Sequence, residues 1–143
     1  MYKMLLVEDE PVCSSDINKV LGNYCVLHIT SSSGIALNLA AANKYNLIMI
    51  DINIRSSMTG INIANSIKNL TSYSSVPIVA FAIIKPEVNK EYLLSCGFTH
   101  LISEPFNSRN FAQHIKYILS SQLNNNYLTA GSFKKPLTPK LVY

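Results

Sequence analysis

The sequence predicts an α/β fold with a doubly wound, five-stranded parallel sheet and five helices. Short apolar runs of strand length alternate five times with segments whose apolar residues recur at helical spacing. The run over residues 46–51, NLIMID, is apolar on both faces and ends at a charge, as expected for a strand in the middle of a parallel sheet. A chain of 143 residues with 48% hydrophobic and 14% charged residues has the size and apolar fraction of one compact domain.

The first half of the chain supplies three strands and three helices. Pro11 suits the first turn of a helix, and Gly22 and Asn23 are good helix stops. Residues 31–33 are serines that can cap the next helix, which continues to Lys44. The predicted strands of this half cover residues 2–7, 24–30 and 46–51, and the predicted helices cover residues 12–21, 35–44 and 61–70.

The second half supplies the remaining two strands and two helices. Pro77 takes the permissible first position of a buried strand that ends at Ala82. A helix over residues 87–96 is stopped by Gly97, and a strand follows over residues 99–103. The last helix, residues 108–119, carries one apolar stripe, which consists of Phe111, Ile115, Ile118 and Leu119.

The composition of the chain limits the classes of protein to which it can belong. No run of eighteen apolar residues and no signal peptide is present, so we expect a cytoplasmic protein. The three cysteines have no paired spacing, so we expect them to be free thiols. We expect neither a disulfide framework nor a structural zinc. The net charge of +4 belongs mainly to residues 123–143, a basic, polar tail after a predicted domain of residues 1–122. We expect the tail to be a solvated end, and do not expect it to bind nucleic acid.

Acidic residues follow two of the predicted central strands. Glu8, Asp9 and Glu10 end the first strand, and Asp51 ends the third. Ligands of doubly wound sheets lie at the carboxyl ends of the strands, where Glu8, Asp9 and Asp51 are expected to meet in one pocket. Clustered carboxylates repel one another unless a cation joins them, and hard oxygen ligands suit Mg²⁺. The alternative is that these acids are simply solvated.

Nucleotide-binding alternatives lack their motifs. No G-x-G-x-x-G follows the first strand, and no glycine-rich loop with Lys-Ser/Thr is present. A flavin mononucleotide would need a Ser/Thr/Gly-rich turn there, whereas the turn reads EDEP and would repel a phosphate.

Five landmarks occur together in this chain: VEDEP after the first strand, LIMID ending the third, Pro77 opening the fourth, Gly97 after the fourth helix, and EPF after the fifth strand. Together they resemble the receiver domain of two-component response regulators, a CheY-like family with the (βα)5 flavodoxin-like fold. The spacing of 22 residues from Ala82 to Glu104 equals the family's usual distance between a strand-four hydroxyl and a strand-five lysine. The match covers about residues 2–120.

The resemblance implies an aspartyl-phosphate switch. Asp51 would be the phosphoacceptor for the phosphoryl group of a sensor histidine kinase or a phosphotransfer protein. Glu8, Asp9 and Asp51, with the backbone carbonyl of Asn53, would hold Mg²⁺. No enzymatic activity is expected beyond self-phosphorylation from a phosphodonor and autodephosphorylation.

Three positions depart from the family's switch. Ala82 replaces the hydroxyl residue, Leu101 replaces the usual aromatic, and Glu104 replaces the lysine. A carboxylate within about 5 Å of Asp51 costs on the order of 3 kcal/mol at an effective dielectric near 20. We therefore expect the acidic group either to take up a cation more avidly or to keep one carboxyl protonated near neutral pH.

The loop after Asp51 also departs, because Arg55 stands where proline is common and Gly60 comes one residue later than usual. We expect Arg55 and Lys85 to be solvated, with proximity to the acidic pocket as the alternative for each.

Two functions follow. The first is a single-domain, atypical receiver that accepts phosphate at Asp51 with an impaired switch. The second is a pseudo-receiver that binds a protein partner without phosphorylation, through the face of the helix over 87–96, the strand over 99–103 and the helix over 108–119.

Overall fold

The computed structural model describes residues 1–83, 89–104 and 107–124, with the backbone alone described for residues 82, 83, 104, 108 and 122–124. Its strands are β1 (Tyr2–Val7), β2 (Cys25–Thr30), β3 (Leu47–Asp51), β4 (Ile78–Ile83) and β5 (His100–Glu104). Its helices are α1 (Pro11–Leu21), α2 (Ser33–Ala42), α3 (Gly60–Lys68), α4 (Lys90–Ser95) and α5 (Ser108–Asn124), with a short 3-10 helix, η1 (Thr71–Tyr73). Two predictions fall on residues outside the described ranges. They are the solvated state of Lys85 and most of the tail over residues 123–143.

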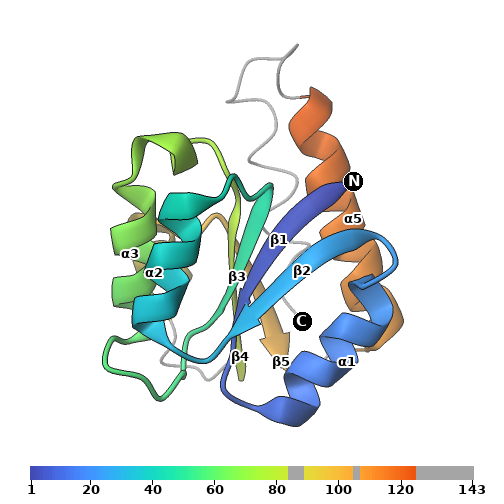
Figure 1. The fold of residues 1–143 in the computed structure, drawn as a ribbon, viewed down its shortest axis with the longest axis horizontal. Helices are drawn as coiled ribbons and strands as arrows, with labels where there is room; N and C mark the ends of the chain where they lie inside the picture. Colours follow the sequence, from blue (N-terminus) through green and yellow to red (C-terminus); the bar gives the residue numbers. More distant parts are fainter. Residues whose placement is uncertain (84–88, 105–106, 125–143) are drawn as a thin grey trace.

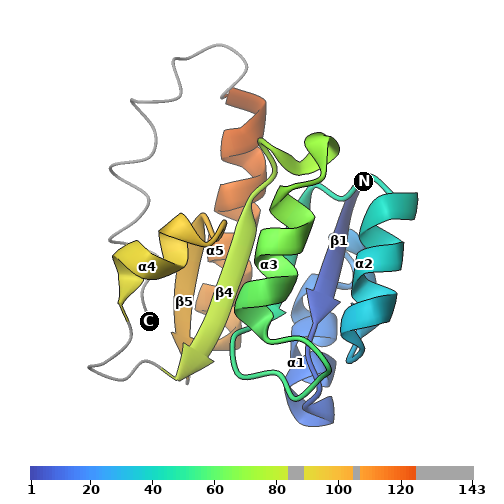
Figure 2. The same cartoon turned by 90° about the vertical axis from the view of Figure 1, so that its left-hand side faces the viewer.

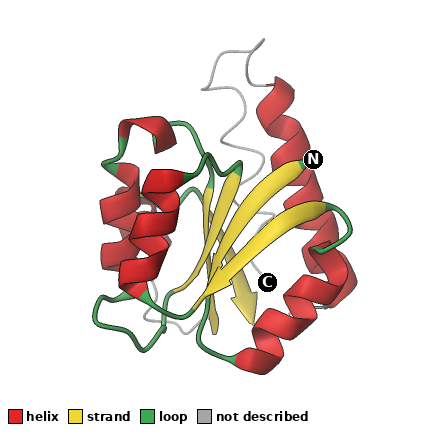
Figure 3. Cartoon of the chain, in the orientation of Figure 1, coloured by secondary structure: helices red, strands yellow, loops and turns green. Residues whose placement is uncertain are grey.

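The five strands form one sheet in the order β2-β1-β3-β4-β5, and all neighbours are parallel. Helices cover both faces, with α1 and α5 on one side and α2, α3 and α4 on the other (Figures 1, 2 and 3). The predicted fold class is therefore confirmed. Parallel strands buried on both faces explain why β1, β3 and β4 read as nearly continuous apolar runs.

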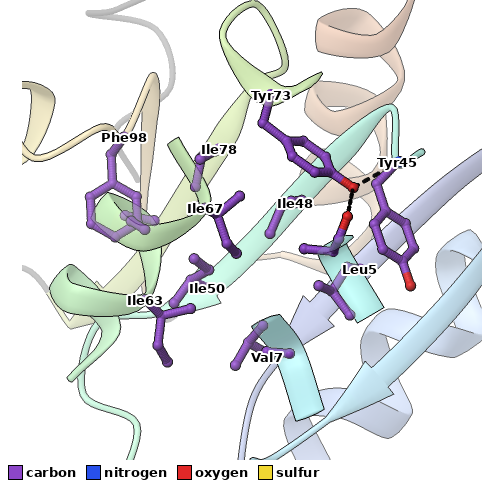
Figure 4. Close-up of a cluster of buried hydrophobic side chains, with 14 of the residues drawn as sticks. Leu5, Val7, Tyr45, Ile48, Ile50, Ile63, Ile67, Tyr73, Ile78 and Phe98 are labelled. Carbon is purple, nitrogen blue, oxygen red and sulfur yellow. Dashed lines mark hydrogen bonds between the residues drawn. The ribbon is translucent and has the colours of Figure 1, made fainter. Parts of the chain in front are cut away.

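Each face of the sheet has its own hydrophobic cluster. The cluster under α1 and α5 includes Ile17, Phe111 and Ile115, which pack on alternate residues of the strands. The cluster under α2, α3 and α4 includes the buried Tyr73 of η1 (Figure 4). The Tyr73 hydroxyl lies 2.8 Å from the Ala40 carbonyl oxygen and 2.7 Å from that of Asn43, so this large side chain is buried with its polar end satisfied.

Two helix ends differ from the sequence-based expectation. The helix expected from Glu87 begins at Lys90, because Asn89 is its N-cap and accepts a hydrogen bond from the Tyr92 N–H at 3.1 Å. The last helix was expected to end at Leu119 and continues to Asn124. The buried Ser121 donates to the Ile118 carbonyl at 3.0 Å, so its hydroxyl is satisfied within the helix rather than ending it.

A glycine begins α3 because the helix starts against the end of β3. A Cβ built on Gly60 would lie 2.5 Å from the Asp51 carbonyl oxygen and 2.8 Å from the Ile52 Cα. Both atoms belong to the backbone, which cannot yield as a flexible side chain would. Gly34, near the start of α2, has only the Ser32 Oγ within reach, at 3.9 Å.

We predict that Gly60→Ala lowers the free energy of unfolding by about 1–3 kcal/mol or more, because the added methyl group overlaps backbone atoms. Gly34→Ala is the matched control and should be neutral or stabilising by about 0.4–1 kcal/mol. Urea unfolding of the two variants and the wild type measures this difference. Equal stabilities of the two variants would contradict the close approach of α3 to the end of β3.

A buried histidine begins β5 at the opposite end of the sheet from Asp51. His100 is buried, and its Nδ1 lies 2.7 Å from the Thr99 hydroxyl. Burial, and secondarily the charges of His114 and Lys68, lower the pKa of His100 from 6.5 to about 4. His100 is therefore neutral in the folded protein at neutral pH.

This shift predicts a stability that depends on pH. The unfolded chain binds a proton on His100 more tightly than the folded protein does. The contribution of the neutral His100 to the free energy of unfolding is therefore complete above about pH 6.5 and is lost as the pH falls toward 4. The loss over this window is on the order of 3 kcal/mol. In urea unfolding at pH 7 and pH 4.5, His100→Gln should show a shallower decline than the wild type. An identical decline in both proteins would rule out the neutral, buried imidazole.

Candidate functional site

The ends of β1 and β3 bring three carboxyl groups together. Val7 pairs with Ile50, so Glu8 and Asp51 are the next residues on two adjacent strands. The Glu8 N–H donates to the Thr30 carbonyl at 3.0 Å, and the Ile52 N–H donates to the Phe81 carbonyl at 3.1 Å. These bonds extend the sheet pairing past the acidic positions. One ligand oxygen from each of Glu8, Asp9 and Asp51 lies within 4.8 Å of the other two.

Each of the three carboxyls has a hydrogen-bond donor of its own. The buried Glu8 accepts from the Glu10 N–H at 2.8 Å, and Asp51 accepts from the Asn53 N–H at 2.9 Å. Asp9 accepts from the Arg55 Nε at 3.0 Å and from the Arg55 backbone N–H at 3.4 Å. The backbone of two turns and one arginine therefore stabilise negative charge in a small volume.

The electrostatics of Asp51 differ from those of Asp9. Burial is the largest effect on Asp51 and raises its pKa, and the nearby charge of Asp9 adds to this rise. The Asn53 N–H and a hydrogen bond with the Glu8 side chain oppose it. The hydrogen bond from the Arg55 side chain lowers the pKa of Asp9, which is ionised at neutral pH.

The carboxylate of Glu10 is not one of the three in this cluster. Its side chain accepts from the Val12 N–H and forms the N-cap of α1.

The cluster fits a divalent cation on the chemistry of its donors. Three carboxylate oxygens from two adjacent strands are hard ligands with an excess of negative charge, which Mg²⁺ prefers. Asn53 lies directly beside them, since its N–H binds Asp51. The assignment of its carbonyl as a ligand remains a prediction.

The loop between β3 and α3, residues 52–59, is attached on two sides. Ile54 is buried in the cluster under α2 and α3. The Ser33 N–H donates to the Ser56 Oγ at 2.9 Å, and the Ser33 and Ser57 hydroxyls lie 2.7 Å apart. Arg55 was expected to be solvated, and its side chain is 85% exposed, yet it forms an ion pair with Asp9. The sequence signal for this pair is a cation four residues after Asp51, in a loop that begins at the acidic site.

The three positions that were expected to depart from the family's switch lie on β4 and β5. Ala82 pairs in register with Ser103, and Glu104 pairs with Ile83. Leu101 is 7% exposed and packs in the cluster under α3 and α4. The side chains of Ala82 and Glu104 lie outside the described part of the chain, as do Pro105 and Phe106.

None of the helices in the described ranges is long and apolar enough to cross a membrane.

Comparison with known proteins identifies the family. Residues 4–116 match the model of the response regulator receiver domain. The histidine kinase P4 of Formosa agariphila is 30% identical over 120 residues, which is 84% of this chain and 9% of the kinase. The chain thus spans under a tenth of the length of that relative.

Solved structures show the same fold. The chemotaxis protein CheY4 of Vibrio cholerae has a TM-score of 0.76 at 20% identity, with 82% of this chain and 98% of that chain covered. The receiver domain of a sensor histidine kinase from Pseudomonas aeruginosa PAO1, whose structure has a magnesium ion coordinated in its active-site cleft, has a TM-score of 0.74 at 21% identity, with 83% and 98% covered. The chain belongs to the family of response regulator receiver domains, the signalling modules of two-component systems.

Proposed function

We propose that this chain is an atypical receiver that accepts a phosphoryl group at Asp51 in two-component or phosphorelay signalling, and whose phosphorylation switch is impaired. The observation that carries the proposal is the convergence of Glu8, Asp9 and Asp51 within 4.8 Å. The phosphodonor would be the phosphohistidine of a sensor histidine kinase or of a phosphotransfer protein.

The chain's own residues account for the chemistry of transfer. An oxygen of Asp51 forms the new P–O bond as the P–N bond to the partner's histidine breaks, and the leaving imidazole takes up a proton. Asp51 is a nucleophile only when its carboxyl is ionised, and the hydrogen bonds with the Asn53 N–H and the Glu8 side chain both favour the ionised form. The Asn53 N–H holds Asp51 Oδ1 at 2.9 Å and so fixes the orientation of the carboxylate.

A bound Mg²⁺ would neutralise the carboxylates and the charge on the transferring phosphoryl oxygens. Glu8, Asp9, Asp51 and the Asn53 carbonyl are the residues proposed to hold it.

The impaired switch follows from the residues at three positions. Ala82 has no hydroxyl to donate to a phosphoryl oxygen, and Glu104 is an anion where the family has a cation. Leu101 has no polar end, and its burial among apolar residues supports a packing role.

The same positions favour a second candidate, a pseudo-receiver that binds a protein without phosphorylation. Helices α4 and α5 expose large apolar side chains, including Tyr92 at 55%, Leu94 at 42% and Tyr117 at 52%. Exposed aromatic residues of this kind are typical of protein interfaces. The partner would then contact the face formed by α4, β5 and α5.

We predict that the chain gains one phosphoryl group when it is incubated with Mg²⁺ and a small phosphodonor such as acetyl phosphate. Intact-mass spectrometry measures the gain, which should disappear in Asp51→Asn and when the divalent cation is chelated. Asp16→Asn, on the exposed side of α1, is the control and should be labelled like the wild type. No label on the wild type, under conditions that label an ordinary receiver, would favour the pseudo-receiver.

We also predict that Ala82→Thr combined with Glu104→Lys raises the labelled fraction or its lifetime roughly tenfold or more, because hydrogen bonds to charged groups contribute about 1.5–3 kcal/mol. Ala82→Thr combined with Glu104→Gln removes the anion without adding a cation. Its labelled fraction or lifetime should fall between the values of the wild type and of the lysine variant. If the lysine variant leaves both the labelled fraction and the lifetime unchanged, the assignment of the two switch positions is wrong.

A further inference from the structure

Arg55 brings a positive charge into direct contact with the acidic cluster. Its Nε and its backbone N–H both point at one oxygen, Asp9 Oδ2, at 3.0 and 3.4 Å. The two bonds from one residue to one oxygen orient Asp9 as well as neutralise it. Asp9 is in turn one of the three carboxyls whose oxygens lie within 4.8 Å of one another.

The position of Arg55 is built into the loop. Ile54, on one side, is only 7% exposed and packs against α2 and α3. Ser56, on the other side, accepts a hydrogen bond from the N-terminus of α2 at 2.9 Å. Because both neighbours are anchored, the backbone N–H of Arg55 is held over the site while its side chain remains 85% exposed.

The guanidinium of Arg55 balances part of the negative charge of this cluster in the structure, because it pairs with Asp9. A divalent cation on Asp9 would stand within a few ångströms of that guanidinium, where two positive charges repel. The exposed arginine can move aside, since water solvates its charge at little cost.

We propose that Arg55 is an internal counter-ion of the acidic site, which a divalent cation must displace from Asp9, so that Arg55 weakens metal binding. The inference rests on the proposed function, because it assumes that the metal binds at Glu8, Asp9 and Asp51. It adds a positioning residue that sets the metal affinity and links metal uptake to the loop over residues 52–59.

The test measures Mg²⁺ binding by isothermal titration calorimetry for the wild type and three variants. Arg55→Gln should bind Mg²⁺ about two- to fivefold more tightly, as expected for loss of an exposed ion pair. The gain should shrink at high salt, because salt screens exposed charges. Arg55→Lys keeps the charge and should stay close to the wild type. Lys44→Gln makes the same change of charge in the loop before β3, at the other end of that strand, and should leave the affinity unchanged.

A second readout follows the arginine itself. In NMR spectra of the wild-type protein, the Arg55 Nε–H resonance should shift as Mg²⁺ is added, with the same midpoint as the calorimetric titration. This readout needs no phosphorylation and reports on the guanidinium alone.

Three results would overturn the counter-ion role. Equal or weaker Mg²⁺ binding by Arg55→Gln would do so while leaving the metal site of the proposed function intact. Tighter binding by Arg55→Lys and by Arg55→Gln alike would show that the charge is not responsible. Absence of Mg²⁺ binding in the wild type and in Arg55→Gln would remove both the counter-ion role and the metal on which the proposed function relies.

Discussion

When two adjacent parallel strands are paired in register, the residues that follow them lie side by side, whatever charges those residues carry. β1 and β3 are neighbours in register, and the chain continues from them into Glu8, Asp9 and Asp51. The sheet is held by two hydrophobic clusters, so it keeps these carboxyls together against their repulsion. An arginine or a metal ion can relieve that repulsion, and the structure contains the arginine, Arg55, paired with Asp9.

The β3–α3 loop is shaped by the same constraint. α3 begins so close to the end of β3 that Gly60 leaves no room for a Cβ. The loop then passes between Ser33 of α2 and Asp9, to which its serines and Arg55 are bonded. In the proposed assignment of the switch, the positions on β4 and β5 are Ala82 and Glu104, which supply neither a hydroxyl nor a cation.

The sequence predicted the fold because its signals were local and repeated. NLIMID is apolar on both faces, and it forms β3 at the centre of the sheet. Glu8, Asp9 and Asp51 were expected to meet from topology alone, and they do so. The Arg55–Asp9 pair was only the alternative to a solvated Arg55, because it joins residues 46 positions apart through the path of a loop that no periodicity describes. The start of α4 was misplaced because the cap of Asn89 was overlooked.

The central claim is that Asp51 belongs to a site that binds a divalent cation together with Glu8 and Asp9. Carbon-detected NMR of the carboxyl groups, titrated with pH in the presence and absence of Mg²⁺, measures this directly. The account predicts that Asp51 titrates above the ordinary range of an aspartate without the metal and that saturating Mg²⁺ lowers its pKa. An Asp51 carboxyl that titrates in the ordinary range and does not respond to Mg²⁺ would contradict the account.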